Sequence, residues 1–160
     1  MSKEKIQFEV NGKSVILEVE PDELLVDVLR KDMGLTGTKV GCREGECGVC
    51  SVIFNGMIVP SCLIPVMKAD GSKVTTVEGL EKDGELHPLQ KEFIEKGAIQ
   101  CGFCIPGMLL SAKNLLDRNP KPTLQEIKTA ISGVLCRCTG YQKIIHAIQA
   151  ASETMRDREI

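Results

Sequence analysis

The eight cysteines of this sequence fall into two blocks of four, with no thiol left over. The first block is Cys42, Cys47, Cys50 and Cys62, and the second is Cys101, Cys104, Cys136 and Cys138. The first block has the spacing C-x4-C-x2-C with one later cysteine, which is the spacing of plant-type loops that hold a [2Fe-2S] cluster. In such loops four thiolates bind two irons, and backbone groups donate to the sulfurs. The sequence therefore predicts an iron–sulfur cluster in its first half.

Zinc is the main competing interpretation, because four cysteines can also surround one tetrahedral ion. The first block offers three ligands from one nine-residue loop, and its x4 gap favours a dinuclear cluster over the two C-x2-C knuckles of a zinc ribbon. The second block taken alone leaves zinc, a cluster and a redox dithiol open. Disulfides are the weakest alternative, because no signal peptide is evident and we expect a cytoplasmic, reducing compartment.

Composition limits the remaining choices. The chain has 160 residues, of which 42% are hydrophobic but only 3% aromatic, so two small modules that need bound metal for stability fit better than one large aromatic core. The net charge of −2 does not favour a nucleic-acid or lipid surface. No window is long and apolar enough to predict a membrane span.

The first module, residues 1–80, has the pattern of a β-grasp sheet. Alternating residues at 6–10 and 14–19 flank Asn11-Gly12, a pair typical of a hairpin turn, and Asn55-Gly56 separates strands 51–54 and 57–60 in the same way. A helix is expected over residues 24–33 and a last strand over 73–77. The order ββαβββ predicts one helix lying across a ferredoxin-like sheet.

The second module, residues 81–160, shows no strand pattern of any length. A charged connection at residues 81–87 leads into helical patterns, one of which begins with the capping box of Thr123 and Glu126. Four helices are expected, over residues 88–96, 106–117, 124–132 and 142–151. The chain is therefore predicted to be an α+β protein, in which a β-grasp domain precedes a four-helix bundle with thiols at its helix ends.

Four motifs in order carry a specific resemblance. They are GCREGECGVC at 41–50, Ser61-Cys62, QCGFCIPGM at 100–108 and CRCTGY at 136–141. Together they resemble the iron–sulfur subunit of the molybdenum hydroxylases, the xanthine oxidase family. Ile105 departs from the threonine expected in many relatives, which affects local packing and no ligand.

The resemblance implies two [2Fe-2S] clusters. The first cysteine block would bind an outer cluster nearer a flavin, and the second an inner cluster nearer a molybdenum cofactor. Gln100 and Cys138 would lie against the pterin. Single electrons would then pass from the molybdenum–pterin centre of a large subunit through both clusters to FAD on a medium subunit. The cytosine dinucleotide form of molybdopterin and a dimer of heterotrimers are the expectations that go with this family.

Other residues are predicted to have ordinary roles. Arg43 and Arg137 beside the cysteines are expected to be solvated, His87 to lie at the surface, and His146 and Met108 to pack in the core. No phosphate-binding loop is present, so FAD belongs to a partner. The alternative to an obligate subunit is a free-standing two-cluster ferredoxin, which a chain this close to neutral favours less, since diffusional docking relies on charge.

Overall fold

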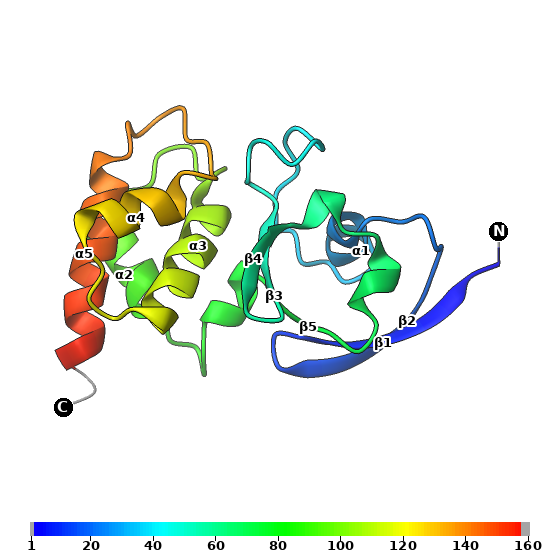
Figure 1. Cartoon of the computed structure of the whole chain (residues 1–160). Helices are drawn as coiled ribbons and strands as arrows, with labels where there is room; N and C mark the ends of the chain where they lie inside the picture. Colours follow the sequence, from blue (N-terminus) through cyan, green and yellow to red (C-terminus); the bar gives the residue numbers. More distant parts are fainter. Residues whose placement is uncertain (1, 158–160) are drawn as a thin grey trace.

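A computed structural model describes residues 2–157 and divides them into a β-sheet half and a helical half (Figure 1). The first half contains strands β1 to β5, helix α1 and the 3-10 helices η1 to η3, and the second contains helices α2 to α5. In chain order the elements are β1 Glu4–Val10, β2 Lys13–Val19, α1 Leu25–Lys31, β3 Ser51–Phe54, β4 Met57–Pro60, η1 Ser61–Leu63, η2 Val66–Ala69, β5 Lys73–Thr75, η3 Val77–Leu80, α2 Pro88–Glu95, α3 Ile105–Arg118, α4 Leu124–Ile131 and α5 Gln142–Asp157.

The sheet has the strand order β2-β1-β5-β3-β4. Two antiparallel hairpins form its outer parts, and their turns use the predicted Asn-Gly pairs, with φ of 51° at Asn11 and 79° at Gly12, and 48° at Asn55 and 81° at Gly56. Strand β5 lies between the hairpins, parallel to β1 and antiparallel to β3. It is shorter than predicted, because the chain turns into η3 after Thr76.

Helix α1 lies across this sheet and closes the first core. Its residues Leu25, Val28 and Leu29 are fully buried against Ile6 and Phe8 of β1 and their apolar neighbours in the other strands. The predicted β-grasp arrangement with a single α-helix is therefore confirmed.

The helical half is built around α3, which buries most of its residues. Met108 of α3 is fully buried, as predicted, and shares one apolar cluster with Phe93, Ile127 and Ile148 from the other three helices. The capping box of Thr123 and Glu126 begins α4 as expected. Leu124, which the helical pattern placed in the buried stripe, is instead 48% exposed, because it is the first residue of α4 and lies outside the packed turn.

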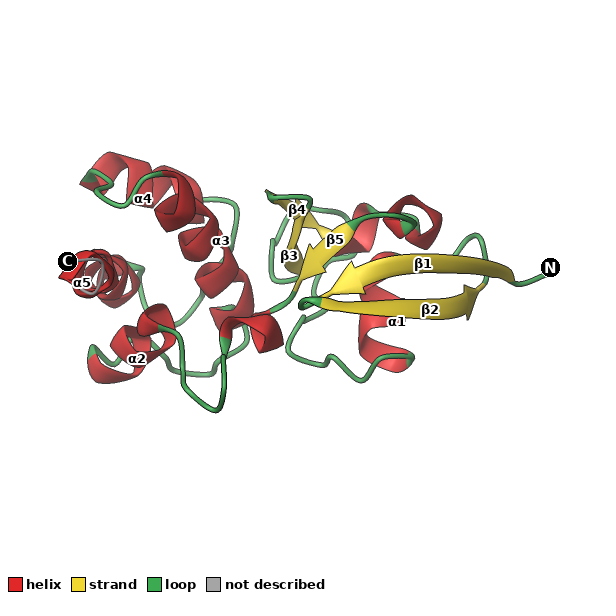
Figure 2. Ribbon diagram, turned by 90° about the horizontal axis from the view of Figure 1, so that it is seen from below, coloured by secondary structure: helices red, strands yellow, loops and turns green. Residues whose placement is uncertain are grey.

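The two halves share an apolar interface. Helix α3 contacts β3, β4 and η3, and Ile53, Ile58 and Val77 from the sheet half pack against the core of the helical half. Figure 2 shows α3 between the β3–β4 hairpin and the remaining helices. Within residues 2–157, no helix is both long enough and apolar enough to cross a membrane.

Candidate functional site

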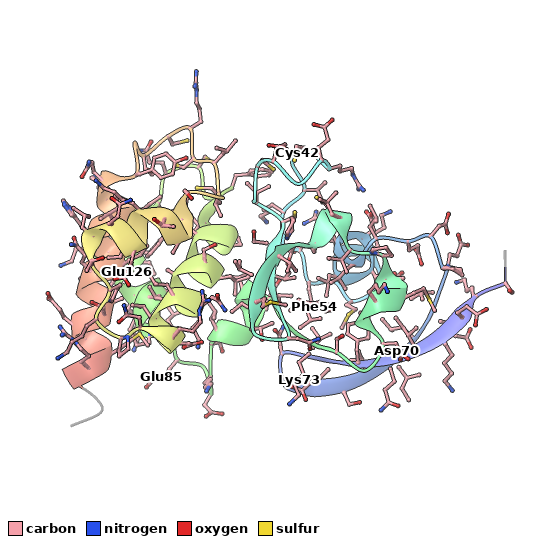
Figure 3. The ribbon with its side chains drawn as sticks, viewed as in Figure 1. Cys42, Phe54, Asp70, Lys73, Glu85 and Glu126 are labelled. Carbon is pink, nitrogen blue, oxygen red and sulfur yellow. The ribbon has the colours of Figure 1, made fainter. Side chains whose placement is uncertain are left out.

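The first four cysteines lie close to one another at one end of the sheet half. Cys42, Cys47 and Cys50 lie in the long loop that joins α1 to β3, and Cys62 lies in η1 directly after β4. Cys42 is at the tip of the molecule in the view of Figure 3, while Cys50 and Cys62 are buried beside Val26 of α1. Hairpin β3–β4 brings Cys62 back to the loop, since Ser51 at the start of β3 pairs with Pro60 at the end of β4.

These four thiols form two pairs. The amide of Cys42 donates to the sulfur of Cys47 at 3.4 Å, and the amide of Cys47 donates to the sulfur of Cys42 at 3.4 Å. The second pair is Cys50 and Cys62, whose thiols hydrogen-bond to each other. Ser61 supports this pair by donating its hydroxyl to the Cys50 carbonyl at 2.6 Å.

The second four cysteines come together from two loops of the helical half. Cys101 lies in the turn before α3 and Cys104 is the N-cap residue of that helix, whereas Cys136 and Cys138 lie between α4 and α5. The thiols of Cys101 and Cys138 are 3.5 Å apart and exposed, and Cys104 pairs with Cys136 on the buried side.

The environments of the thiols differ in a way that their pKa values reflect. Backbone amides of Glu44 and Cys47 donate to the Cys42 sulfur and lower its pKa to about 7. Burial raises the pKa of Cys50 to about 11 and that of Cys104 to about 12. For Cys136, burial acts to raise the pKa, but hydrogen bonds from Thr139 outweigh it and the pKa is lowered. The loops thus stabilise some thiolates directly, and the buried thiols need a cation to become thiolates.

This donor set fits two dinuclear clusters better than two single ions. Within residues 2–157, no three His, Cys, Asp or Glu side chains converge on a point where they could hold one metal ion. A [2Fe-2S] cluster needs two thiolates at each of two irons, and the structure provides two thiol pairs in each block, with backbone amides directed at sulfur.

The two cysteine blocks are joined at the interface between the halves. The amide of Leu135, next to Cys136, donates to the carbonyl of Cys47 at 2.9 Å. Gly48 approaches so closely that a Cβ atom there would collide with the carbonyl oxygen of Gly133. A buried side chain adds a second link, because Asn114 of α3 donates to the Gly56 carbonyl at 2.7 Å.

Several residues beside the cysteines differ from their predicted roles. Arg43 was expected to be solvated, but its guanidinium makes two bonds of 2.8 and 2.9 Å to Asp27 of α1, which lowers the pKa of Asp27 to about 2. His146 was expected to pack in the core but is exposed on α5. His87 is half-buried and caps α2 by accepting from the Leu89 amide at 3.2 Å. Arg137 is exposed, as predicted.

The structure also shows supporting residues that sequence reasoning missed. Thr139 and Tyr141 hydrogen-bond to Cys136, and Asn114 bonds across the interface as described above. The signal in the sequence was weak: Tyr141 is the sole tyrosine of the chain and stands three residues after Cys138. Gln100 is exposed and donates its amide to the Cys138 carbonyl at 3.2 Å, so these two predicted pterin contacts lie side by side.

Comparison with known proteins supports the same assignment over the whole chain. A model of the 2Fe-2S iron-sulfur cluster binding domain matches residues 8–79, and a model of the [2Fe-2S] binding domain matches residues 76–149. The nicotinate dehydrogenase small FeS subunit of Eubacterium barkeri is 52% identical over 153 residues, covering 96% of this chain and 98% of the relative.

Two further relatives agree. In Pseudomonas putida, one of the subunits of nicotinate dehydrogenase is 44% identical and is covered over 96% of its length by 94% of this chain. The solved structure of quinoline 2-oxidoreductase from Pseudomonas putida 86 superposes with a TM-score of 0.94 at 43% identity, covering 100% of both chains. This chain therefore belongs to the iron–sulfur small subunits of the molybdenum hydroxylase (xanthine oxidase) family, and it is an electron-transfer subunit of an oxidoreductase.

Proposed function

We propose that the eight cysteines are the ligands of two [2Fe-2S] clusters. Cys42, Cys47, Cys50 and Cys62 hold the outer cluster, and Cys101, Cys104, Cys136 and Cys138 hold the inner cluster. The observation that carries this assignment is the division of each block into two thiol pairs, which is what two irons with two thiolates each require. The chain is proposed to divide into domains at residues 80 and 81, so that each domain holds one cluster.

We further propose the direction of the relay. When bound, the clusters supply one-electron transfer, carrying electrons from a molybdenum–pterin centre on a large partner subunit, through inner and outer clusters, to FAD on a medium subunit. This chain fixes the separation of the two sites, because the Leu135 amide holds the Cys47 carbonyl and helix α3 packs on the β3–β4 hairpin. Electron tunnelling weakens steeply with distance, so this rigidity is the main contribution of the protein.

The pterin contact is proposed at Gln100 and Cys138. Both residues are exposed, and the hydrogen bond from the Gln100 amide to the Cys138 carbonyl places them together on the outer side of the inner cysteine block. The buried pair, Cys104 and Cys136, lies toward the loop of the outer block. This polarity supports a molybdenum partner on the Cys101–Cys138 side and a flavin partner on the Cys42 side.

The assembly we propose is a cytoplasmic dimer of heterotrimers, with molybdopterin as its cytosine dinucleotide form. Eight unpaired thiols support a reducing compartment. The substrate is bound by the molybdenum partner, so we propose nicotinate as the first compound to assay, because two of the relatives above are nicotinate dehydrogenase subunits.

The test begins with iron and acid-labile sulfide analysis of the anaerobically isolated chain. We expect four irons, four sulfides and two distinct S = 1/2 EPR signals after reduction with dithionite. Cys50→Ser should remove one signal and Cys104→Ser the other, so each variant controls for the other. Zinc without sulfide would refute the cluster assignment.

Copurification separates the subunit from the free-standing ferredoxin. A tagged chain expressed in its own host should bring down polypeptides that contain molybdenum and flavin in a fixed ratio. A fully loaded two-cluster chain that always purifies alone would favour the diffusible carrier instead.

A further inference from the structure

A side-chain hydroxyl lies against one ligand of the inner block. The Oγ1 atom of Thr139 is 3.1 Å from the sulfur of Cys136, and the Thr139 amide also donates to that sulfur at 3.5 Å. Within the described part of the chain, Cys136 is the cysteine whose sulfur contacts a hydroxyl, since the other hydrogen bonds to thiols come from backbone amides or from a second cysteine.

The direction of this hydrogen bond follows from its surroundings. The Tyr141 amide donates to Thr139 Oγ1 at 3.2 Å, so one lone pair of the hydroxyl oxygen is already used. A cysteine that ligates a metal is a thiolate and has no proton to give. The threonine proton is therefore the one that lies between the two atoms, and Thr139 donates to Cys136.

The loop holds Thr139 in this position from both ends. The Tyr141 hydroxyl accepts from the Cys136 amide at 2.9 Å and donates to the Val134 carbonyl at 3.3 Å. Gly140 and Tyr141 both have left-handed backbone conformations, with φ of 62° and 67°, which turn the chain back toward the cysteine. The hydroxyl is thus fixed before any metal is bound.

We propose that the Thr139 hydroxyl sets the reduction potential of the inner cluster relative to the outer one. The proposal rests on the ligand set given under the proposed function. Reduction adds negative charge that spreads over the sulfur ligands, so a hydrogen-bond donor at Cys136 stabilises the reduced form more than the oxidised form. The outer block uses backbone amides for this purpose, whereas the inner block has a side chain that mutation can remove.

The test compares Thr139→Val with Thr139→Ser in the full chain loaded with both clusters. Valine keeps the shape of threonine without the hydroxyl, and serine keeps the hydroxyl. Potentiometric titration followed by EPR reads both clusters in one sample, so the outer cluster is an internal standard. We expect Thr139→Val to lower the ratio of reduced to oxidised inner cluster about tenfold at fixed potential, equivalent to about 59 mV for a one-electron couple. Thr139→Ser should stay near the wild type.

Several outcomes overturn the proposal. They are an unchanged inner potential in Thr139→Val, an equal shift in Thr139→Ser, and an equal shift of both clusters. Thr139→Ala is a second variant without a hydroxyl. If neither hydroxyl-free variant retains the inner cluster, the hydroxyl is needed to hold the cluster and the proposal also fails. Iron and sulfide content of the wild type separates these results from a failure of the cluster assignment itself.

Discussion

The close approach of Gly48 to Gly133 makes Gly48→Ala the most informative substitution in the interface. Gly48 has φ of +66°, and an added Cβ would meet the carbonyl oxygen of Gly133, with the Val134 Cα atom at 3.0 Å. Both neighbours are backbone atoms of the loop that leads to Cys136, so neither can rotate away. The methyl group must therefore push the two halves apart or distort a cysteine loop.

A matched control is present at Gly56, which has φ of +81° and no atom within 4 Å of an added Cβ. Gly56→Ala carries only the cost of a left-handed alanine, about 1–2 kcal/mol. Gly48→Ala adds an overpacking term of about 1–3 kcal/mol, for a total of about 2–5 kcal/mol. For a chain of this size, 1 kcal/mol lowers Tm by about 2–4 °C. We therefore expect Tm to fall by about 2–8 °C for Gly56→Ala and about 4–20 °C for Gly48→Ala.

The assay is thermal unfolding of the loaded chain followed by far-UV circular dichroism at one heating rate, with iron content matched between samples. Magnetic interaction between the two reduced clusters, read by EPR, reports whether the halves have moved. A Gly48→Ala chain that melts no earlier than Gly56→Ala, with unchanged magnetic interaction, would refute the close contact between the two cysteine loops.

Three other outcomes are expected. Arg43→Lys should speed loss of the outer cluster to a chelator, while the inner cluster is lost at the wild-type rate, because lysine cannot make the paired bonds to both oxygens of Asp27; loss measured from the two EPR signals should leave Arg137→Lys as an unchanged control. Asn114→Ala should lower Tm by about 2–8 °C by leaving the buried Gly56 carbonyl without its donor, a loss of about 1–2 kcal/mol, and a Tm equal to the wild type would show that water replaces the amide. In the chain stripped of metal, the thiolate of Cys42 forms as pH rises through its pKa of about 7, so iodoacetamide should label it at a rate that levels off above about pH 8, whereas labelling of Cys50 should keep rising toward pH 11; peptide mass spectrometry checks the order, and equal rates at both cysteines would contradict it.

Local patterns predicted the elements of this fold well, because the residues that define them act on their own neighbours. Each Asn-Gly pair occupies a turn with two positive φ angles, and the side chain of Thr123 caps α4 through Glu126. The resemblance predicted which cysteines belong to which block. Spacing alone could not decide that the thiol of Cys101 pairs with Cys138 while Cys104 pairs with Cys136, since that depends on how two separate loops meet.

What the sequence could not reveal depends on contacts between distant segments. The bond from Leu135 to Cys47 joins residues 88 positions apart and follows no periodic pattern. The bonds from Arg43 to Asp27 and from Thr139 to Cys136 depend on loop conformations with positive φ at Arg43 and Tyr141, which residue type does not favour there. His146 has apolar neighbours in sequence but points to solvent, because its position on α5 faces away from the bundle.

The bond between the Leu135 amide and the Cys47 carbonyl also bears on how the holoprotein matures. Cluster insertion must order a flexible loop, and each loop here is partly shaped by the other. A chain that has received its first cluster therefore offers the scaffold that delivers the second one a loop with fewer conformations to search. We expect filling of the two sites to be cooperative, so that a population short of iron contains empty and complete chains in preference to half-filled ones.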